Sequence, residues 1–285
     1  MAGVREIKGR IRSVKNIQQI TKAMKMVAAA RIKKVETRMK ASRPYAYKMR
    51  EVVGELTSQL KGALHPLMQV RPTKKVGLVV VTADKGLCGS YNNNLVKLAF
   101  NWLRKLPAGL ETELITVGGK GYRFFLKRNA HIVKEYLGWN PEYALARALA
   151  QQVSQDFIDG KVDEVHCVYT RVLSAMSQEA TVVKILPFTN EGAEGPTRQL
   201  DYIFEPDPAT ALVTILPRYL EVIFFQILLE ARTAELGARL RAMSNATDNA
   251  SKLVGDLTLD FFRARQAAIT NEILEVAGGA EALKK

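Results

Sequence analysis

The stretch that decides the fold runs from residue 232 to residue 271 and reads RTAELGARLRAMSNATDNASKLVGDLTLDFFRARQAAITN. Apolar and small residues recur in it at alternating spacings of four and three, which is typical of a coiled-coil seam. No proline follows Pro217, so about sixty residues from Arg218 are predicted to form one helix of roughly 90 Å. A helix of that length needs a partner to pack against. The seam positions are Leu236, Leu240, Met243, Thr247, Ala250, Val254, Leu257, Phe261, Ala264 and Ala268.

The seam is weakly apolar, because three alanines and a threonine occupy four of its ten positions. This composition predicts a close-packed pair of helices rather than a strong dimeric zipper. A second long helix is predicted from about Arg5 to Leu60, and its apolar stripe shifts once near Ile17. Such a shift indicates a broader buried face or contacts with two partners, and Pro44 predicts a bend or a local interruption. The stripe comprises Val4, Ile7, Ile11 and Val14, then Ile17, Ile20, Met24 and Val27, then Ile32, Val35 and Met39.

Positive charge is concentrated in the first helix. The chain carries a net charge of +14, and residues 1–50 contain fifteen Lys or Arg against Glu6 and Glu36, so +13 lies there. So many like charges repel one another unless an acidic partner is near, which favours binding to an acidic protein surface. A basic coiled-coil protein that binds nucleic acid is the alternative, because phosphate contacts need little beyond clustered Lys and Arg. Against it, the tyrosines of this helix are only Tyr45 and Tyr47, and no nucleic-acid-binding module accompanies it.

Between the two helices the apolar pattern changes to short runs that alternate with helical segments. This alternation predicts βαβ units, and hence a mainly parallel, Rossmann-like α/β sheet inserted between two antiparallel coiled-coil helices. The predicted domains are an N-terminal helix (1–60), an α/β foot domain with connectors (61–208) and a C-terminal helix with a protruding tip (209–285). Asp207 is the predicted N-cap of the last helix, with Pro208 as its first residue. Strands are predicted at residues 76–81, 114–117, 131–136, 164–169 and 181–186, and helices at 91–106, 120–128 and 141–158.

The order of the segments also predicts a register for the helix pair. Both long helices join the same inserted domain, so they must run antiparallel if they pair, and paired residue numbers should sum to about 270. Val4 is then expected near Gln266, and Met24 near Ala246. The last fifteen or so residues extend beyond the first helix, and their apolar stripe needs a socket on another protein. That tip contains Ile269, Ile273, Leu274 and Val276.

Candidate chemical sites are few. The glycine-containing loop at residues 81–90 and the glycines at 118–121 fit neither GxGxxG nor GxxxxGK[ST], so no cofactor is expected there. A tight turn is expected at residues 118–121. The three histidines are scattered, Cys88 and Cys167 lack metal-ligand spacing, and no set of residues suits catalysis. Two reduced thiols in a cytoplasmic protein are expected. Neither a signal peptide nor a run of about eighteen uncharged apolar residues is present, so no membrane insertion is expected.

Three motifs resemble the gamma subunit of bacterial F-type ATP synthases, the central rotor shaft. They are ITKAMKMVA at residues 20–28, DKGLCG at 84–89 and RARQAAITNEI at 263–273. The segments ATDNA at 246–250 and DYIFEPDP at 201–208 also look like family signatures, and the similarity spans nearly the whole chain.

The resemblance implies a rotor subunit that couples rotation of the c-ring to conformational cycling of the catalytic beta subunits, and that has no catalytic residue itself. The implied partners are the ring of alpha and beta subunits, the epsilon subunit and the c-ring, at the cytoplasmic side of the bacterial membrane. By motif, the family's c-ring contacts fall on Asp201, Tyr202 and Glu205. Its beta-coupling positions fall on Met24, Lys85, Cys88, Arg265, Gln266 and Thr270.

Two features depart from the family. Chloroplast members carry a thiol-containing regulatory insert, and this chain has no such cysteine pair. Lys25 stands where the family often has an acidic residue, beside the coupling position Met24. The sequence leaves open the effect of Lys25, the coupling ion and the degree of ATPase inhibition.

Overall fold

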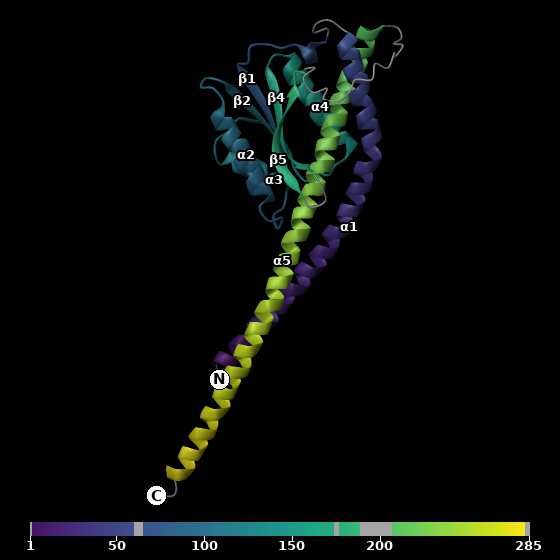
Figure 1. Cartoon of the computed structure of the whole chain (residues 1–285). Helices are drawn as coiled ribbons and strands as arrows, with labels where there is room; N and C mark the ends of the chain where they lie inside the picture. Colours follow the sequence, from purple (N-terminus) through teal and green to yellow (C-terminus); the bar gives the residue numbers. More distant parts are fainter. Residues whose placement is uncertain (1, 60–64, 174–176, 189–206, 283–285) are drawn as a thin grey trace. The chain divides into compact units, whose positions relative to one another are not determined.

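The computed structural model describes residues 2–59, 65–173, 177–188 and 207–282. Two compact units divide the chain: a helix-pair unit, Met1–Ala29 with Arg239–Lys285, and a sheet unit, Ala30–Ala238. Two long helices, α1 (Ala2–Gln59) and α5 (Pro208–Ala282), each contribute to both units (Figure 1). The expected α/β domain lies between them in sequence.

The sheet unit contains one five-stranded sheet in the order β3-β2-β1-β4-β5. β1 pairs in parallel with β2 and β4, β2 pairs in parallel with β3, and only the edge pair β4–β5 is antiparallel. The predicted mainly parallel sheet is therefore confirmed. The elements are η1 (Pro66–Met68), β1 (Lys75–Val81), α2 (Tyr91–Lys105), β2 (Glu111–Val117), α3 (Gly119–Leu126), β3 (Ile132–Tyr136), α4 (Tyr143–Ile158), β4 (Glu164–Val172) and β5 (Gln178–Leu186).

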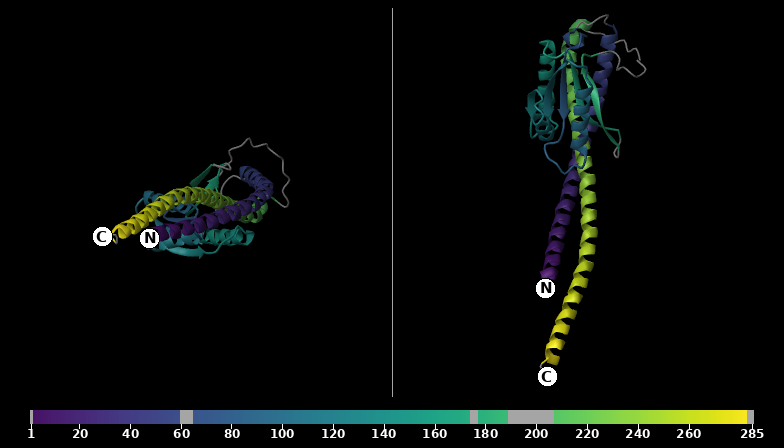
Figure 2. Two further views of the ribbon diagram at one scale, coloured as in Figure 1. Left: turned by 90° about the horizontal axis from the view of Figure 1, so that it is seen from below. Right: turned by 90° about the vertical axis from the view of Figure 1, so that its left-hand side faces the viewer.

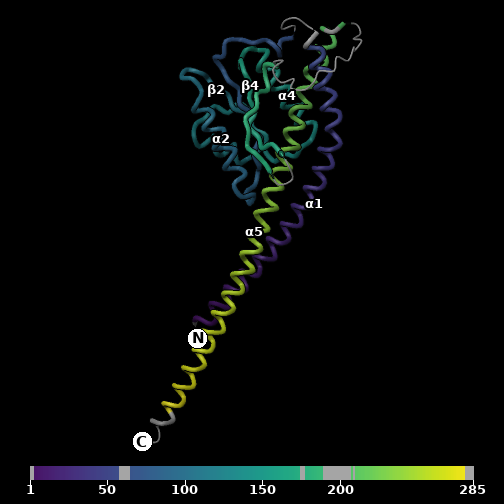
Figure 3. Tube along the Cα trace, viewed as in Figure 1, coloured from purple at the N-terminus to yellow at the C-terminus, as the bar shows by residue number. Residues whose placement is uncertain are grey.

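Both faces of the sheet are covered, because alternate residues of the buried strand β1 point to opposite faces. Val79 and Val81 pack against α4 and the first turns of α5, and Leu78 and Val80 pack against α2 and α3. Figures 1 and 3 show this division, with α2 and α3 on one side of the sheet and α4 and α5 on the other. The near-continuous apolar run of β1 reflects burial on both faces.

The sheet unit also holds the first part of α5. Its residues at four-residue spacing, from Leu212 to Leu228, are fully or almost fully buried in the core between α5, the sheet and the end of α1. One window within Ala209–Gly279 is long and apolar enough to cross a membrane, with a mean hydropathy of 1.7. Of that window 44% is buried within the protein, and the core helix of a soluble protein passes the same test of length and composition.

Two local predictions concern the long helices. Asp207 caps α5 as predicted: its Oδ1 accepts from the backbone N–H of Thr210 at 2.9 Å, and its Oδ2 accepts from the Thr210 hydroxyl at 2.7 Å. These bonds lower the pKa of the Asp207 carboxyl. In contrast, α1 runs through Pro44 without the local interruption that the sequence allowed. The sequence also predicts turns at residues 189–208, from glycine and proline, and most of that stretch lies outside the described residues.

In the helix-pair unit, residues 2–29 of α1 lie antiparallel beside α5, which continues past the N-terminus (Figure 2). The seam predicted for α5 is confirmed, because each of its positions from Met243 to Ala268 is buried or half-buried. The predicted shift of the α1 stripe is wrong. Ile17, Ile20 and Val27 are exposed by 49–59%, and the stripe continues straight through Gln18, Thr21 and Ala28, which are half-buried or buried.

Candidate functional site

A polar layer joins the two helices within the helix-pair unit. The hydroxyl of Thr247 lies 2.8 Å from that of Thr21 and also donates to the backbone carbonyl of Met243 at 2.8 Å. One turn along, the ammonium of Lys25 donates to the hydroxyl of Ser244 at 3.0 Å. Lys25 is half-buried and directed at α5, so it acts first as a contact between the helices.

These pairs also fix the register. The residue numbers of Thr21 and Thr247 sum to 268, and those of Lys25 and Ser244 sum to 269. In the sheet unit, Gln226 donates to the hydroxyl of Ser42 at 2.8 Å, which again gives 268. The predicted value of about 270 is therefore confirmed to within two residues in each unit.

The surface of α1 is basic and partly apolar. Of the fifteen Lys and Arg in residues 1–50, all but Lys25 are exposed, so their charge faces outward along the helix. At the other end of the chain, every described side chain of α5 from residue 269 to residue 279 is exposed. The tip residues Ile269, Ile273, Leu274 and Val276 are exposed by 44%, 62%, 64% and 73%.

The coupling positions transferred by resemblance are distributed over both units. In the helix-pair unit Met24 is half-buried, whereas Arg265, Gln266 and Thr270 are exposed. The Thr270 hydroxyl donates to the Gln266 carbonyl at 2.9 Å, an ordinary intrahelical bond that leaves their surface available.

In the sheet unit, Lys85 is exposed but Cys88 is 1% exposed. The Asn92 side chain donates from its amide nitrogen to the Cys88 sulfur at 3.2 Å. Its amide oxygen accepts from the backbone N–H of Ala83 at 2.9 Å. Cys88 therefore shapes this loop from inside, whereas Lys85 and Leu87 present it to the surface. Asp201, Tyr202 and Glu205 lie outside the described residues.

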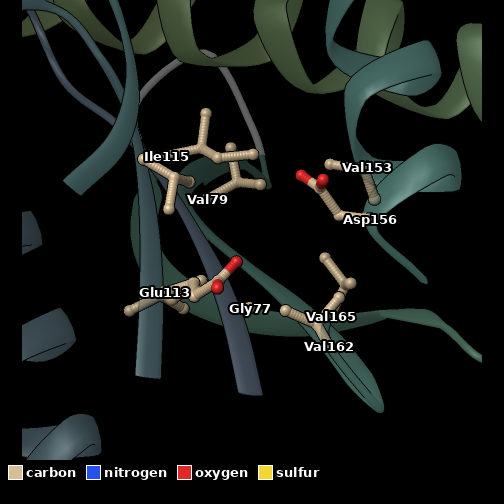
Figure 4. A pocket seen from close by; sticks show the side chains of 10 residues that line it. Gly77, Val79, Glu113, Ile115, Val153, Asp156, Val162 and Val165 are labelled. Atoms are coloured by element: carbon tan, nitrogen blue, oxygen red, sulfur yellow. The ribbon is translucent and has the colours of Figure 1, made fainter. Parts of the chain in front are cut away.

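A small crevice opens beside β1 at Gly77. A Cβ added at Gly77 would lie 3.3 Å from a side-chain methyl of Val162 and 3.4 Å from one of Val165. Figure 4 shows mainly valine and isoleucine side chains around it, with the carboxylates of Glu113 and Asp156 on two sides. Asp156 is already bonded to Gln152 at 2.7 Å and Lys161 at 3.1 Å. The crevice is a packing feature with a satisfied carboxylate and suits neither a cofactor nor a metal.

Sequence reasoning missed a buried polar junction between α2, α5 and the loop after β3. Glu235 is 1% exposed and pairs with Arg232 at 2.6 Å, and the Arg232 guanidinium lies 5.9 Å from the ring centroid of Trp139. The Tyr91 hydroxyl donates to the Ala231 carbonyl at 3.0 Å. The pKa of Tyr91 is raised mainly by burial and further by the nearby charge of Glu235. Because these residues come from α2, α5 and the loop after β3, no sequence pattern groups them.

A family model described as ATP synthase matches residues 3–283. An ATP synthase gamma chain of Moorella thermoacetica is 47% identical over 286 residues and covers all of both chains. The ATP synthase gamma chain of Desulfitobacterium hafniense is 42% identical, also with full coverage of both.

Chains in solved structures of mitochondrial ATP synthases share the fold. A chain of the central stalk and c-ring structure of the Tetrahymena thermophila mitochondrial ATP synthase is 26% identical, with a TM-score of 0.62 over 80% of this chain and 99% of that one. A chain of the Euglena gracilis mitochondrial enzyme shares the fold, with 19% identity and a TM-score of 0.71 over 99% and 95% of the two chains. With the identity to the bacterial relatives extending over its full length, this chain belongs to the ATP synthase gamma-chain family.

Proposed function

We propose that this chain is the central-stalk rotor subunit of a bacterial F-type ATP synthase. In this role it couples rotation of the c-ring to conformational cycling of the catalytic beta subunits. The observation that carries the proposal is the surface of the helix-pair unit. The seam between α1 and α5 includes a polar layer at Thr21 and Thr247, while large apolar side chains such as Ile17, Ile20 and Val276 face outward. Large apolar side chains exposed at several places along the unit suit contact with other proteins.

The exposed charge of α1 supports a partner with an acidic surface. Its fourteen outward-facing cations would attract the acidic segments of surrounding beta subunits, and would weaken their own repulsion by doing so. We assign no catalytic residue to this chain, so nucleotide chemistry takes place on the beta subunits. Torque arises because an asymmetric shaft makes different contacts with each beta subunit and so favours different conformations in turn.

The sheet unit would form the foot of the rotor, beside the epsilon subunit and on the c-ring, with Asp201, Tyr202 and Glu205 at the c-ring contact. Lys85 would face a beta subunit, and Cys88 would support that loop from inside. The chain would thus be peripheral to the bacterial membrane on its cytoplasmic side. Met24, Arg265, Gln266 and Thr270 would belong to the coupling part of the shaft.

Reconstitution with purified alpha and beta subunits of a related bacterial enzyme tests this role. We expect a stable assembly in which ATP hydrolysis is accompanied by rotation of a probe attached to the sheet unit. If the chain failed to enter the assembly, the proposal would be wrong. Salt-dependent binding of the isolated chain to duplex DNA without any such assembly would favour the nucleic-acid alternative.

The tip can be tested with a matched pair of valines. Val276 is 73% exposed at the end of α5, and Val70 is 71% exposed in the connector before β1. Replacing Val276 by Asp should reduce torque in the assembly, because a charge would enter the proposed apolar bearing. Replacing Val70 by Asp should leave torque unchanged. Equal torque in both variants would contradict the assignment of the tip as a bearing.

A further inference from the structure

The carboxyl edge of the sheet contains a site that the rotor role does not use. In open α/β sheets, ligands bind beyond the carboxyl ends of the strands, where helix N-termini and backbone N–H groups hold phosphates. In this chain the loops that follow β1, β2 and β3 meet at that edge. The side chain at their meeting point is Asp84, which is half-buried.

Three backbone N–H groups converge on the Asp84 carboxylate. Oδ1 accepts from Gly119, the first residue of α3, and from Gly138, each at 2.9 Å. Oδ2 accepts from the backbone N–H of Trp139 at 3.1 Å. The donors lie at the start of α3 and in the loop after β3, and the acceptor lies in the loop after β1. The cradle is therefore assembled by the fold and is not the local cap of one helix. The positive end of the α3 dipole adds to the attraction.

The frame around the cradle is tightly fixed. The backbone carbonyl of Thr82 accepts from the indole N–H of Trp139 at 2.8 Å. The hydroxyl of Thr82 accepts from the backbone N–H of Gly121 at 2.9 Å. The backbone N–H of Lys120 donates to the Ala83 carbonyl at 3.1 Å. These bonds hold the two donor loops in place without the help of Asp84, so the cradle should persist when the carboxylate is removed.

We propose that Asp84 is an intramolecular ligand that fills an oxyanion site at the carboxyl edge of the sheet. The carboxylate takes up the three backbone N–H groups that an oxyanion could otherwise bind, and the site is therefore closed from within. Removing the carboxylate should open it to a small oxyanion of similar shape, such as formate. This inference does not rest on the proposed rotor function, because it concerns only contacts within the sheet unit.

The arrangement also positions the loop that follows. The Asp84 backbone carbonyl accepts from Arg123 at 3.1 Å, and Leu87 is held at φ 63° with its side chain 63% exposed. A non-glycine residue in the left-handed region persists only where its surroundings fix the backbone. Asp84 thus anchors one end of the loop that presents Lys85 and Leu87, and Asn92 holds its inner side.

Chemical rescue of the full-length chain tests the proposal. Asp84→Ala leaves three N–H donors without an acceptor, so its urea midpoint should fall and then recover as sodium formate replaces sodium chloride at constant ionic strength. With formate at ten times its dissociation constant, the unfolding equilibrium constant should fall roughly tenfold. Asp163→Ala is the matched control. Asp163 is also half-buried and accepts two backbone N–H bonds, from Lys74 and Lys75 at 2.9 and 3.0 Å, but at the opposite edge of the sheet.

Hydrogen exchange gives a site-specific measurement. In Asp84→Ala the amides of Gly119, Gly138 and Trp139 should exchange faster, and formate but not chloride should restore their protection. If formate affected Asp84→Ala no more than Asp163→Ala, the proposal would be overturned. Should Asp84→Ala fail to fold, recovery on refolding in formate would support the proposal, and failure in both salts would oppose it.

Asp84→Asn provides a second variant that keeps the size of the side chain. Its amide has a single acceptor oxygen, so either the Trp139 amide or those of Gly119 and Gly138 should lose protection. Formate should have no effect on this variant, because the amide still fills the site. Protection of all three amides equal to that of the wild type would overturn the assignment of the carboxylate as their ligand.

Discussion

Replacing Gly118 by Ala should be among the most destabilising single changes in the sheet unit. Gly118 has φ 98°, and a Cβ built on it would lie 2.1 Å from the Thr82 carbonyl oxygen and 2.7 Å from the Thr82 carbonyl carbon. The Thr82 carbonyl would have to move by roughly 1 Å to reach ordinary contact distance. That movement would break its 2.8 Å bond from the Trp139 indole N–H, which is buried.

Three contributions give the magnitude. The positive φ costs an alanine about 1 to 2 kcal/mol. The steric overlap costs about 1 to 3 kcal/mol, and a buried donor left without a partner costs about 1 to 3 kcal/mol. A loss of about 3 to 8 kcal/mol in the free energy of unfolding is therefore expected, a large part of the stability of an ordinary domain.

Gly109 supplies the matched control. It has φ 95°, and no atom lies within 4 Å of the Cβ that alanine would add. Gly109→Ala should thus cost only the conformational contribution, about 1 to 2 kcal/mol. Urea unfolding followed by tryptophan fluorescence should separate the two variants by roughly 1 M in midpoint. If both variants shifted the midpoint equally, the close approach of the loops around Thr82 would be refuted.

Three further predictions follow from burial. Phe224→Ala should lower the free energy of unfolding by about 3 to 5 kcal/mol in urea titrations, because Phe224 is fully buried between α5 and the sheet. His65 accepts from the backbone N–H of Leu67 at 3.1 Å through Nδ1, and burial lowers the pKa of His65. Stability should therefore fall as pH drops below the ordinary histidine pKa of about 6.5, and His65→Asn, which keeps an acceptor, should flatten that dependence in pH-dependent thermal unfolding. Cys88 and Cys167 are buried, and burial raises the pKa of Cys167, so iodoacetamide should modify neither until urea unfolds the chain, as mass spectrometry can measure.

Much of the sheet unit follows from its sequence because the central strand β1 is buried on both faces. Runs such as residues 76–81 are then apolar at every position, and the glycines between strands and helices mark turns that demand unusual backbone angles. Gly118, expected at a tight turn, indeed adopts φ 98°. The N-cap Asp207 was predictable for the same local reason, since an aspartate before a proline is a strong helix-start pattern.

The cradle around Asp84 could not be predicted, although Asp84 was recognised in a loop and Gly119 in a tight turn. Its donors, Gly119, Gly138 and Trp139, are 35 to 55 residues from Asp84 in sequence and become neighbours only when β1, β2 and β3 align. An aspartate in a loop is common, and its side chain carries no sequence signal that distinguishes an internal ligand from a solvated residue. Only the convergence of loops in space makes that distinction.

The wrong stripe on α1 has a more general cause. Hydrophobicity favoured Ile17 and Ile20 as seam residues, yet the seam uses Gln18, Thr21 and Ala28, whose small or polar side chains lie against α5. Two helices that approach closely need small residues at the contact, and Thr21 satisfies its hydroxyl with Thr247 across the seam. Large apolar side chains that the seam does not use, such as Ile17 and Ile20, are then exposed on the outer surface. These side chains are available for contacts beyond the helix pair, which suits the proposed shaft enclosed by other subunits.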